Sequence, residues 1–149
     1  MNKEFGISSL ISQLQSDSKF NPSVLPFLIN LLYDTSLGLF KAKEYESALT
    51  YLREAISLIP SEFADRSYYD LSLKIMVLTG RVQFSRGEFE EALVIFENLQ
   101  RKVDNPTDLY KVKYYYLETC SHLCRYEIVY DEFMDMLAYD PATLCLVAN

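Results

Sequence analysis

The chain has 149 residues, with 14 basic and 21 acidic side chains and a formal net charge of −7 at pH 7. This acidity argues against a nucleic-acid partner, because binding to a phosphate backbone depends on clustered Lys and Arg. No stretch has the length and apolar character of a membrane span or a signal peptide, and three crowded cysteines do not make a disulfide framework. We therefore expect one soluble intracellular domain over residues 1–149, in the nucleus or cytoplasm, with no membrane partner.

The first predicted element is an amphipathic helix over residues 3–16. Its apolar residues recur at helical spacing and fall on one side: Phe5, Ile7, Leu10, Ile11 and Leu14. Three helix pairs are predicted after it, with approximate bounds of 23–42 and 45–58, 67–86 and 89–101, and 107–123 and 126–138.

Two sites along the chain carry the signals of a helix start. Asn105 is a favourable cap, Pro106 suits the first helical position and Asp108 lies in the first turn. Asp140-Pro141 offers a similar start shortly before the sequence stops. We therefore expect residues 142–149 to begin a further helix that is cut short.

The predicted helix pairs repeat one pattern. Ala48 and Ala92 are 44 residues apart, and an aromatic residue stands three positions before each of them, Tyr45 and Phe89. A small alanine allows two antiparallel helices to approach closely, and the aromatic residue is expected to fill the gap at the turn. Tyr126 holds the equivalent place in a weaker third unit. The 44-residue interval between the first two units is long for one helix pair, so either the connection around residues 60–67 or the helices that flank it must be extended.

The second unit carries the most specific set of residues: Gly80, Gly87, Phe89, Ala92 and Phe96. This set resembles the tetratricopeptide repeat (TPR) family. The resemblance implies an all-α, right-handed solenoid of antiparallel helix hairpins, with about seven helices and repeat units at about 29–60, 73–104 and 110–141. The third unit departs from the family pattern, because Val129 and Met136 replace the usual alanines.

The order of features also resembles the N-terminal domains of TPR subunits of the anaphase-promoting complex. The features are the leading helix, the Pro-containing entry from Asn21-Pro22 to Pro26, the segment from Leu37 to Tyr45, the enlarged first connection and the degenerate third unit. In that group such domains form homodimers. The resemblance implies a non-enzymatic homodimerisation and scaffold domain of a cell-cycle ubiquitin ligase. A monomeric TPR peptide-binding adaptor, or a small TPR-type secretion chaperone, is the alternative.

The resemblance also implies a partner-binding groove lined by the first helix of each pair. Ten residues are expected to line it: Tyr33, Leu37, Phe40, Lys41, Lys74, Val77, Arg81, Phe84, Lys111 and Tyr114. The groove is partly aromatic and apolar, which suits a bound helix. Three occupants remain open: the N-terminal helix of the same chain, a second copy, or another protein.

Nothing in the sequence indicates catalysis. Cys120 and Cys124 are four residues apart, which places them on one face of the predicted helix, but no further metal ligands accompany them. We interpret both as buried structural cysteines. His122 is the only histidine and no Gly-rich phosphate loop is present, so we expect no enzyme activity, no cofactor, no metal and no small-molecule substrate.

Overall fold

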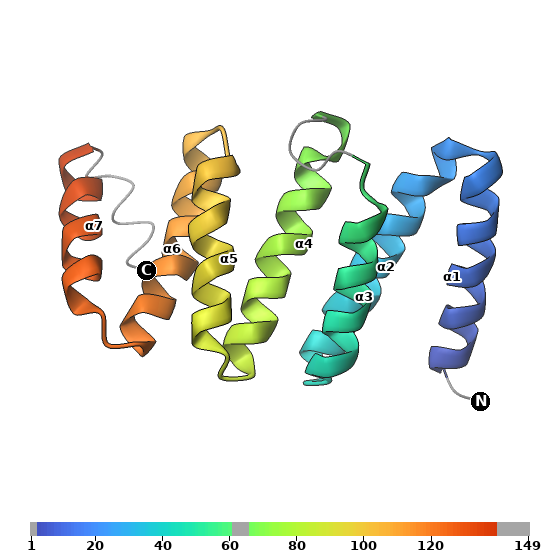
Figure 1. Ribbon diagram of the computed structural model, residues 1–149, viewed down its shortest axis with the longest axis horizontal. Coiled ribbons are helices and arrows are strands. Elements are labelled where there is room, and N and C mark those ends of the chain that lie inside the picture. The colour runs from blue at the N-terminus through green and yellow to red at the C-terminus, as the bar shows by residue number, and fades with distance from the viewer. Residues whose placement is uncertain (1–2, 61–65, 140–149) are drawn as a thin grey trace. The chain divides into compact units, whose positions relative to one another are not determined.

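The computed structural model describes residues 3–60 and 66–139, which form helices joined by short connections (Figure 1). In chain order the elements are α1 (Lys3–Phe20), the 3-10 turn η1 (Pro22–Val24), α2 (Leu25–Lys41), α3 (Tyr45–Leu58), α4 (Arg66–Ser85), α5 (Phe89–Lys102), α6 (Pro106–His122) and α7 (Tyr126–Tyr139). No strand occurs in the described part. The predicted all-α class is confirmed, whereas the further helix expected after Pro141 lies outside the described residues.

Two compact units make up the chain, Met1–Leu78 and Thr79–Asn149. The boundary between them falls inside α4, so each unit contains part of that helix. We describe the two units separately. The right-handed solenoid and the single-domain organisation stay predictions.

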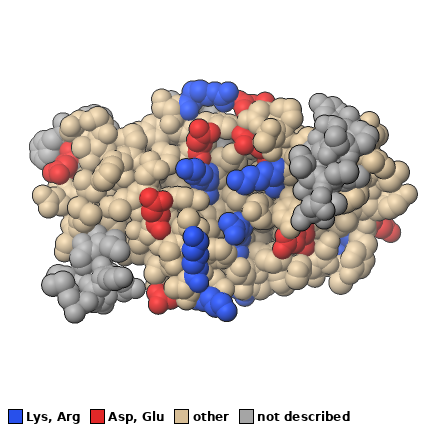
Figure 2. Space-filling model, turned by 180° about the vertical axis from the view of Figure 1, so that it is seen from behind, with Lys and Arg blue, Asp and Glu red and all other residues tan. Residues whose placement is uncertain are grey.

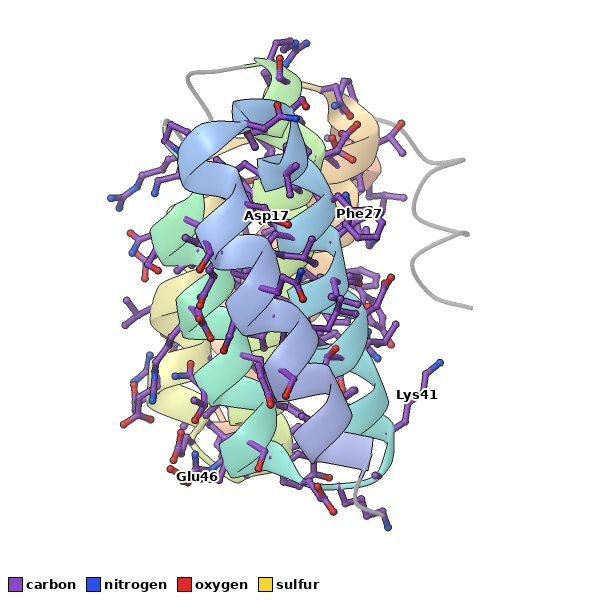
Figure 3. All side chains as sticks on the ribbon, turned by 90° about the vertical axis from the view of Figure 1, so that its right-hand side faces the viewer. Asp17, Phe27, Lys41 and Glu46 are labelled. Atoms are coloured by element: carbon purple, nitrogen blue, oxygen red, sulfur yellow. The ribbon has the colours of Figure 1, made fainter. Side chains whose placement is uncertain are left out.

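In the first unit, α1 lies beside the α2–α3 hairpin (Figure 3). Ile11 is buried, with 4% of its surface exposed, and the Gln15 side-chain amide donates to the carboxylate of Glu54 on α3. The helix runs four residues beyond its predicted end. Polar residues near position 16 do not break a helix, whereas Pro22 restricts the backbone before it and supplies no N–H.

Three turns inside the hairpins have the same geometry. Each has a residue with positive φ at its centre: Lys43 (63°), Gly87 (82°) and Cys124 (59°). In each, the next N–H donates to the carbonyl five residues back: Glu44 to Leu39, Glu88 to Gln83 and Arg125 to Cys120, all at 2.9 Å. This left-handed residue and its hydrogen bond form a recurrent helix C-terminal motif. The chain therefore reverses direction in the same way three times.

The small residues predicted at the helix contacts are buried. Ala48 and Ala92 are both 0% exposed. Gly80 makes the closest approach, because a Cβ added there would lie 2.5 Å from Cζ of Phe96, which is itself 1% exposed. At the equivalent positions of the first hairpin, 44 residues earlier, stand Ser36 and Leu52, both fully buried. Phe96 is larger than Leu52 of the first hairpin, and Gly80, which faces it, is correspondingly smaller than Ser36.

The start of α6 is confirmed in detail. Asn105 is the cap, with extended backbone, and its side-chain oxygen accepts a hydrogen bond of 2.9 Å from the backbone N–H of Asp108. Pro106 occupies the first helical position, where no N–H is needed. The Asp108 carboxylate also accepts from the Asn105 side-chain amide at 2.5 Å.

Tyr126 does not fill a gap at its turn, so this prediction is wrong. Tyr45 and Phe89 are half-buried and contact the aromatic residue five positions earlier, with ring centroids 5.9 Å from Phe40 and 5.0 Å from Phe84. Tyr126 is 63% exposed. The residue five positions before it is Ser121, which offers no ring to pack against.

Candidate protein-interaction surface

In the first unit, α2 supplies four of the predicted groove residues. Tyr33, Leu37 and Phe40 are half-buried, and Lys41 is exposed. Phe40 packs on Tyr45 of α3, so part of its ring is used inside the hairpin. Leu37, the aliphatic residue of this set, is half-buried and leaves part of its side chain available to a partner.

Phe27 is a further apolar residue of α2 that the sequence reasoning missed. It is 62% exposed, and Figure 3 shows it on the same side of the hairpin as Lys41. The sequence signal for this surface is a row of residues at helical spacing on α2: Phe27, Leu31, Asp34 and Lys41. Phe27 precedes the first repeat unit, so the repeat pattern does not predict a role for it.

The two predicted residues on this unit's part of α4 differ in their exposure. Lys74 is exposed, and its Nζ lies 5.7 Å from the ring centroid of Tyr33, within the range of a cation–π contact. Val77 is 6% exposed. Val77 therefore belongs to the core and offers almost no surface to a partner, which corrects its place among the ten groove residues.

In the second unit, Arg81 and Phe84 of α4 contact rings of other helices. The guanidinium carbon of Arg81 lies 5.7 Å from the centroid of Tyr115. Phe84 packs edge-on against Phe89 and against His122, with the His122 centroid 4.7 Å away. His122 also stacks on Phe89 at 5.1 Å. The only histidine of the sequence is thus part of an aromatic cluster, a role that its position in the sequence did not reveal.

Lys111 and Tyr114 of α6 are both exposed, Tyr114 by 44%. At least one ring of the run from Tyr114 to Tyr116 was expected to face outward, and Tyr114 does so. Beside it, a hollow of about 300 Å³ opens between α6 and α7. Its lining residues are Tyr114, Leu117, Glu118, Ser121, His122, Val129 and Phe133.

The environment of Tyr116, which is half-buried, and of the buried Cys120 favours the neutral form of each side chain. Burial raises the pKa of Tyr116 to about 12, with a further contribution from Cys120. Burial likewise raises the pKa of the Cys120 thiol above its usual value, so little thiolate forms there. The expectation for Cys124 is wrong. This residue is exposed and lies after the end of α6, so the two cysteines do not share a helical face.

Among residues 3–60 and 66–139, no three His, Cys, Asp or Glu side chains come together in a way that could hold a metal ion. None of the helices described combines the length and the apolar character that a bilayer span requires. On the face shown in Figure 2, Lys and Arg side chains are interspersed with Asp and Glu, so neither sign of charge covers it.

No family model matches the sequence, and neither a curated protein nor a solved structure matches it. The described residues form an all-α protein in which three helix turns share one geometry.

Proposed function

We propose that the chain is a non-enzymatic protein-interaction scaffold that forms a homodimer through the outward side of α2. The observation that carries the proposal is the 62% exposure of Phe27, on the same side of α2 as the exposed Lys41 further along the helix (Figure 3). Phe is among the residue types most often fully buried, and exposed aromatic residues often anchor interfaces. The resemblance of the sequence to the N-terminal domains of TPR subunits of the anaphase-promoting complex suggests a place in such a ubiquitin-ligase assembly.

A monomeric peptide-binding adaptor is the second candidate. The hollow of about 300 Å³ between α6 and α7 favours it, because one large side chain of a peptide could enter there. Both candidates bind proteins, and they differ in whether the chain pairs with itself.

Light scattering coupled to size exclusion, over a range of protein concentrations, tests the proposal. The dimer should dissociate in Phe27→Glu and in Leu37→Glu, because a charge would be desolvated at the interface. Val94→Glu is the matched control, since Val94 is 56% exposed on α5, and it should remain dimeric.

Circular dichroism separates loss of pairing from loss of folding. Phe27→Glu should retain full helicity, because its ring already lies largely in solvent. A wild-type chain that is monomeric at every concentration would refute the homodimer and leave the adaptor. Dissociation by Val94→Glu as well would show that the effect is not specific to α2.

A further inference from the structure

The outer side of α7 carries a row of exposed apolar side chains. Tyr126 is 63% exposed, Tyr130 65%, Met134 47% and Leu137 40%. Their spacing of four, four and three residues places them on one face of the helix. Since a large aromatic side chain offers about 150–250 Å², the two tyrosines alone leave on the order of 250 Å² of ring surface in solvent. With Met134 and Leu137 the apolar row reaches on the order of a few hundred Å², the size at which a patch bordered by polar residues is often functional.

A row of carboxylates runs directly beside the apolar row. Glu127, Asp131 and Asp135 each follow one residue after a member of that row, so they form a parallel line along one of its edges. Within residues 66–139, no ion pair joins any of the three to a cation. The fourth acid of α7, Glu132, points elsewhere and is bound by Lys113 at 2.5 Å.

The other edge of the apolar row borders the hollow between α6 and α7. Val129 and Phe133 of α7 line it, together with residues of α6 that include Glu118. A helix lying on the apolar row could therefore place one large side chain in the hollow and its cations against the carboxylates.

We propose that the exposed face of α7, with the adjoining hollow, binds an amphipathic helix of a protein partner whose apolar side is bordered by Lys or Arg. This surface is distinct from the α2 surface of the proposed homodimer. Charge complementarity selects the partner, because one edge of the exposed row is lined by three carboxylates that form no ion pair with a cation of residues 66–139.

A second copy of α7 does not supply the complementary charge. The helix contains four acidic residues and no Lys or Arg. Pairing two such helices in antiparallel would set like charges opposite each other, and pairing them in parallel would bury carboxylates against apolar groups. Both arrangements are unfavourable.

The test uses a synthetic amphipathic peptide of about 18 residues, or about five turns, with Leu on one face and Lys on both flanks. A matched peptide carries Glu in place of every Lys. Binding to the full chain is measured by fluorescence anisotropy. The Lys peptide should bind at least about tenfold more tightly than the Glu peptide, and the difference should shrink at high salt.

Variants of α7 then locate the site. Tyr130→Ala should weaken binding of the Lys peptide about tenfold, as expected for an aromatic anchor, with Val94→Ala as the control. The triple variant Glu127→Gln/Asp131→Asn/Asp135→Asn should weaken it as well. Its control, Asp17→Asn/Glu44→Gln/Asp70→Asn, changes the net charge equally at exposed positions away from α7 and should have little effect.

Three results would overturn the proposal: equal affinity for the two peptides, equal loss in the two triple variants, or unchanged binding in Tyr130→Ala. Dissociation of a homodimer by Tyr130→Ala would also overturn it, because the occupant would then be a second copy. The homodimer is judged separately by Phe27→Glu, which should leave peptide binding unchanged.

Discussion

Gly80→Ala tests the close helix contact in the second unit, because two opposing effects can be compared in magnitude. Replacing Gly by Ala inside a helix stabilises it by about 1 kcal/mol through backbone propensity. The new methyl would lie 2.5 Å from Cζ and 2.7 Å from Cε1 of Phe96, well inside van der Waals contact. Overpacking of a core costs about 1–3 kcal/mol. The ring is 1% exposed and has little room to move, so the upper part of that range applies.

We therefore expect a net destabilisation of about 2 kcal/mol, or a fall in Tm of about 6 °C for a chain of this size. The measurement is urea unfolding followed by circular dichroism. Gly38→Ala is the matched control, since Gly38 lies inside α2 and a Cβ there meets nothing within 4 Å. This control should gain up to about 1 kcal/mol from propensity alone.

A double-mutant cycle isolates the contact between Gly80 and Phe96. In a Phe96→Leu background the ring is gone and the facing side chain matches Leu52 of the first hairpin. Gly80→Ala should then be neutral or stabilising. The packing explanation fails if Gly80→Ala costs the same in both backgrounds, or if the single variant is as stable as the wild type.

Three further outcomes follow from described contacts. Asn105→Ala should cost about 1 kcal/mol by removing the cap of α6, measured by urea unfolding. Burial raises the folded-state pKa of Tyr116 from 10.0 to about 12. The stability that this shift contributes should therefore be fully present below pH 10 and be lost as the pH rises towards 12. Tyr116→Phe should remove this part of the loss of stability at alkaline pH. In a Cys145→Ser background, Cys124 should react with a thiol-specific disulfide reagent in the native state, and Cys120 only upon unfolding, because Cys124 is exposed and Cys120 buried. Equal reaction rates at the two thiols would contradict the assigned burial.

The helices and their order followed from the sequence because periodicity, capping and turn signals agreed. The start of α6 is the clearest case, since Asn105 and Pro106 act locally and need no tertiary context. The long first interval predicts a long connection or extended helices, and residues 61–65 of that connection lie outside the described part. Within the described residues α4 is three residues longer than α6, which accounts for part of the interval.

Features of the third unit were less accessible because they depend on contacts rather than on residue type. Tyr126 matches Tyr45 in sequence, but its burial required a ring on the preceding helix, and Ser121 supplies none. Cys124 was assigned to a helical face because nothing marks the end of α6, where no Gly takes the left-handed position. The predicted groove residues lie on α2, α4 and α6, whereas the largest group of exposed apolar side chains among the described residues lies on α7.

The shared turn has a consequence for how such a chain can change in length. All three hairpins reverse within three residues, at 42–44, 86–88 and 123–125. Added length in a connecting loop costs only about 0.6 kcal/mol per doubling, whereas an insertion at a turn would misplace its left-handed residue. A change in length between two hairpins should therefore be tolerated more readily than one within a hairpin turn.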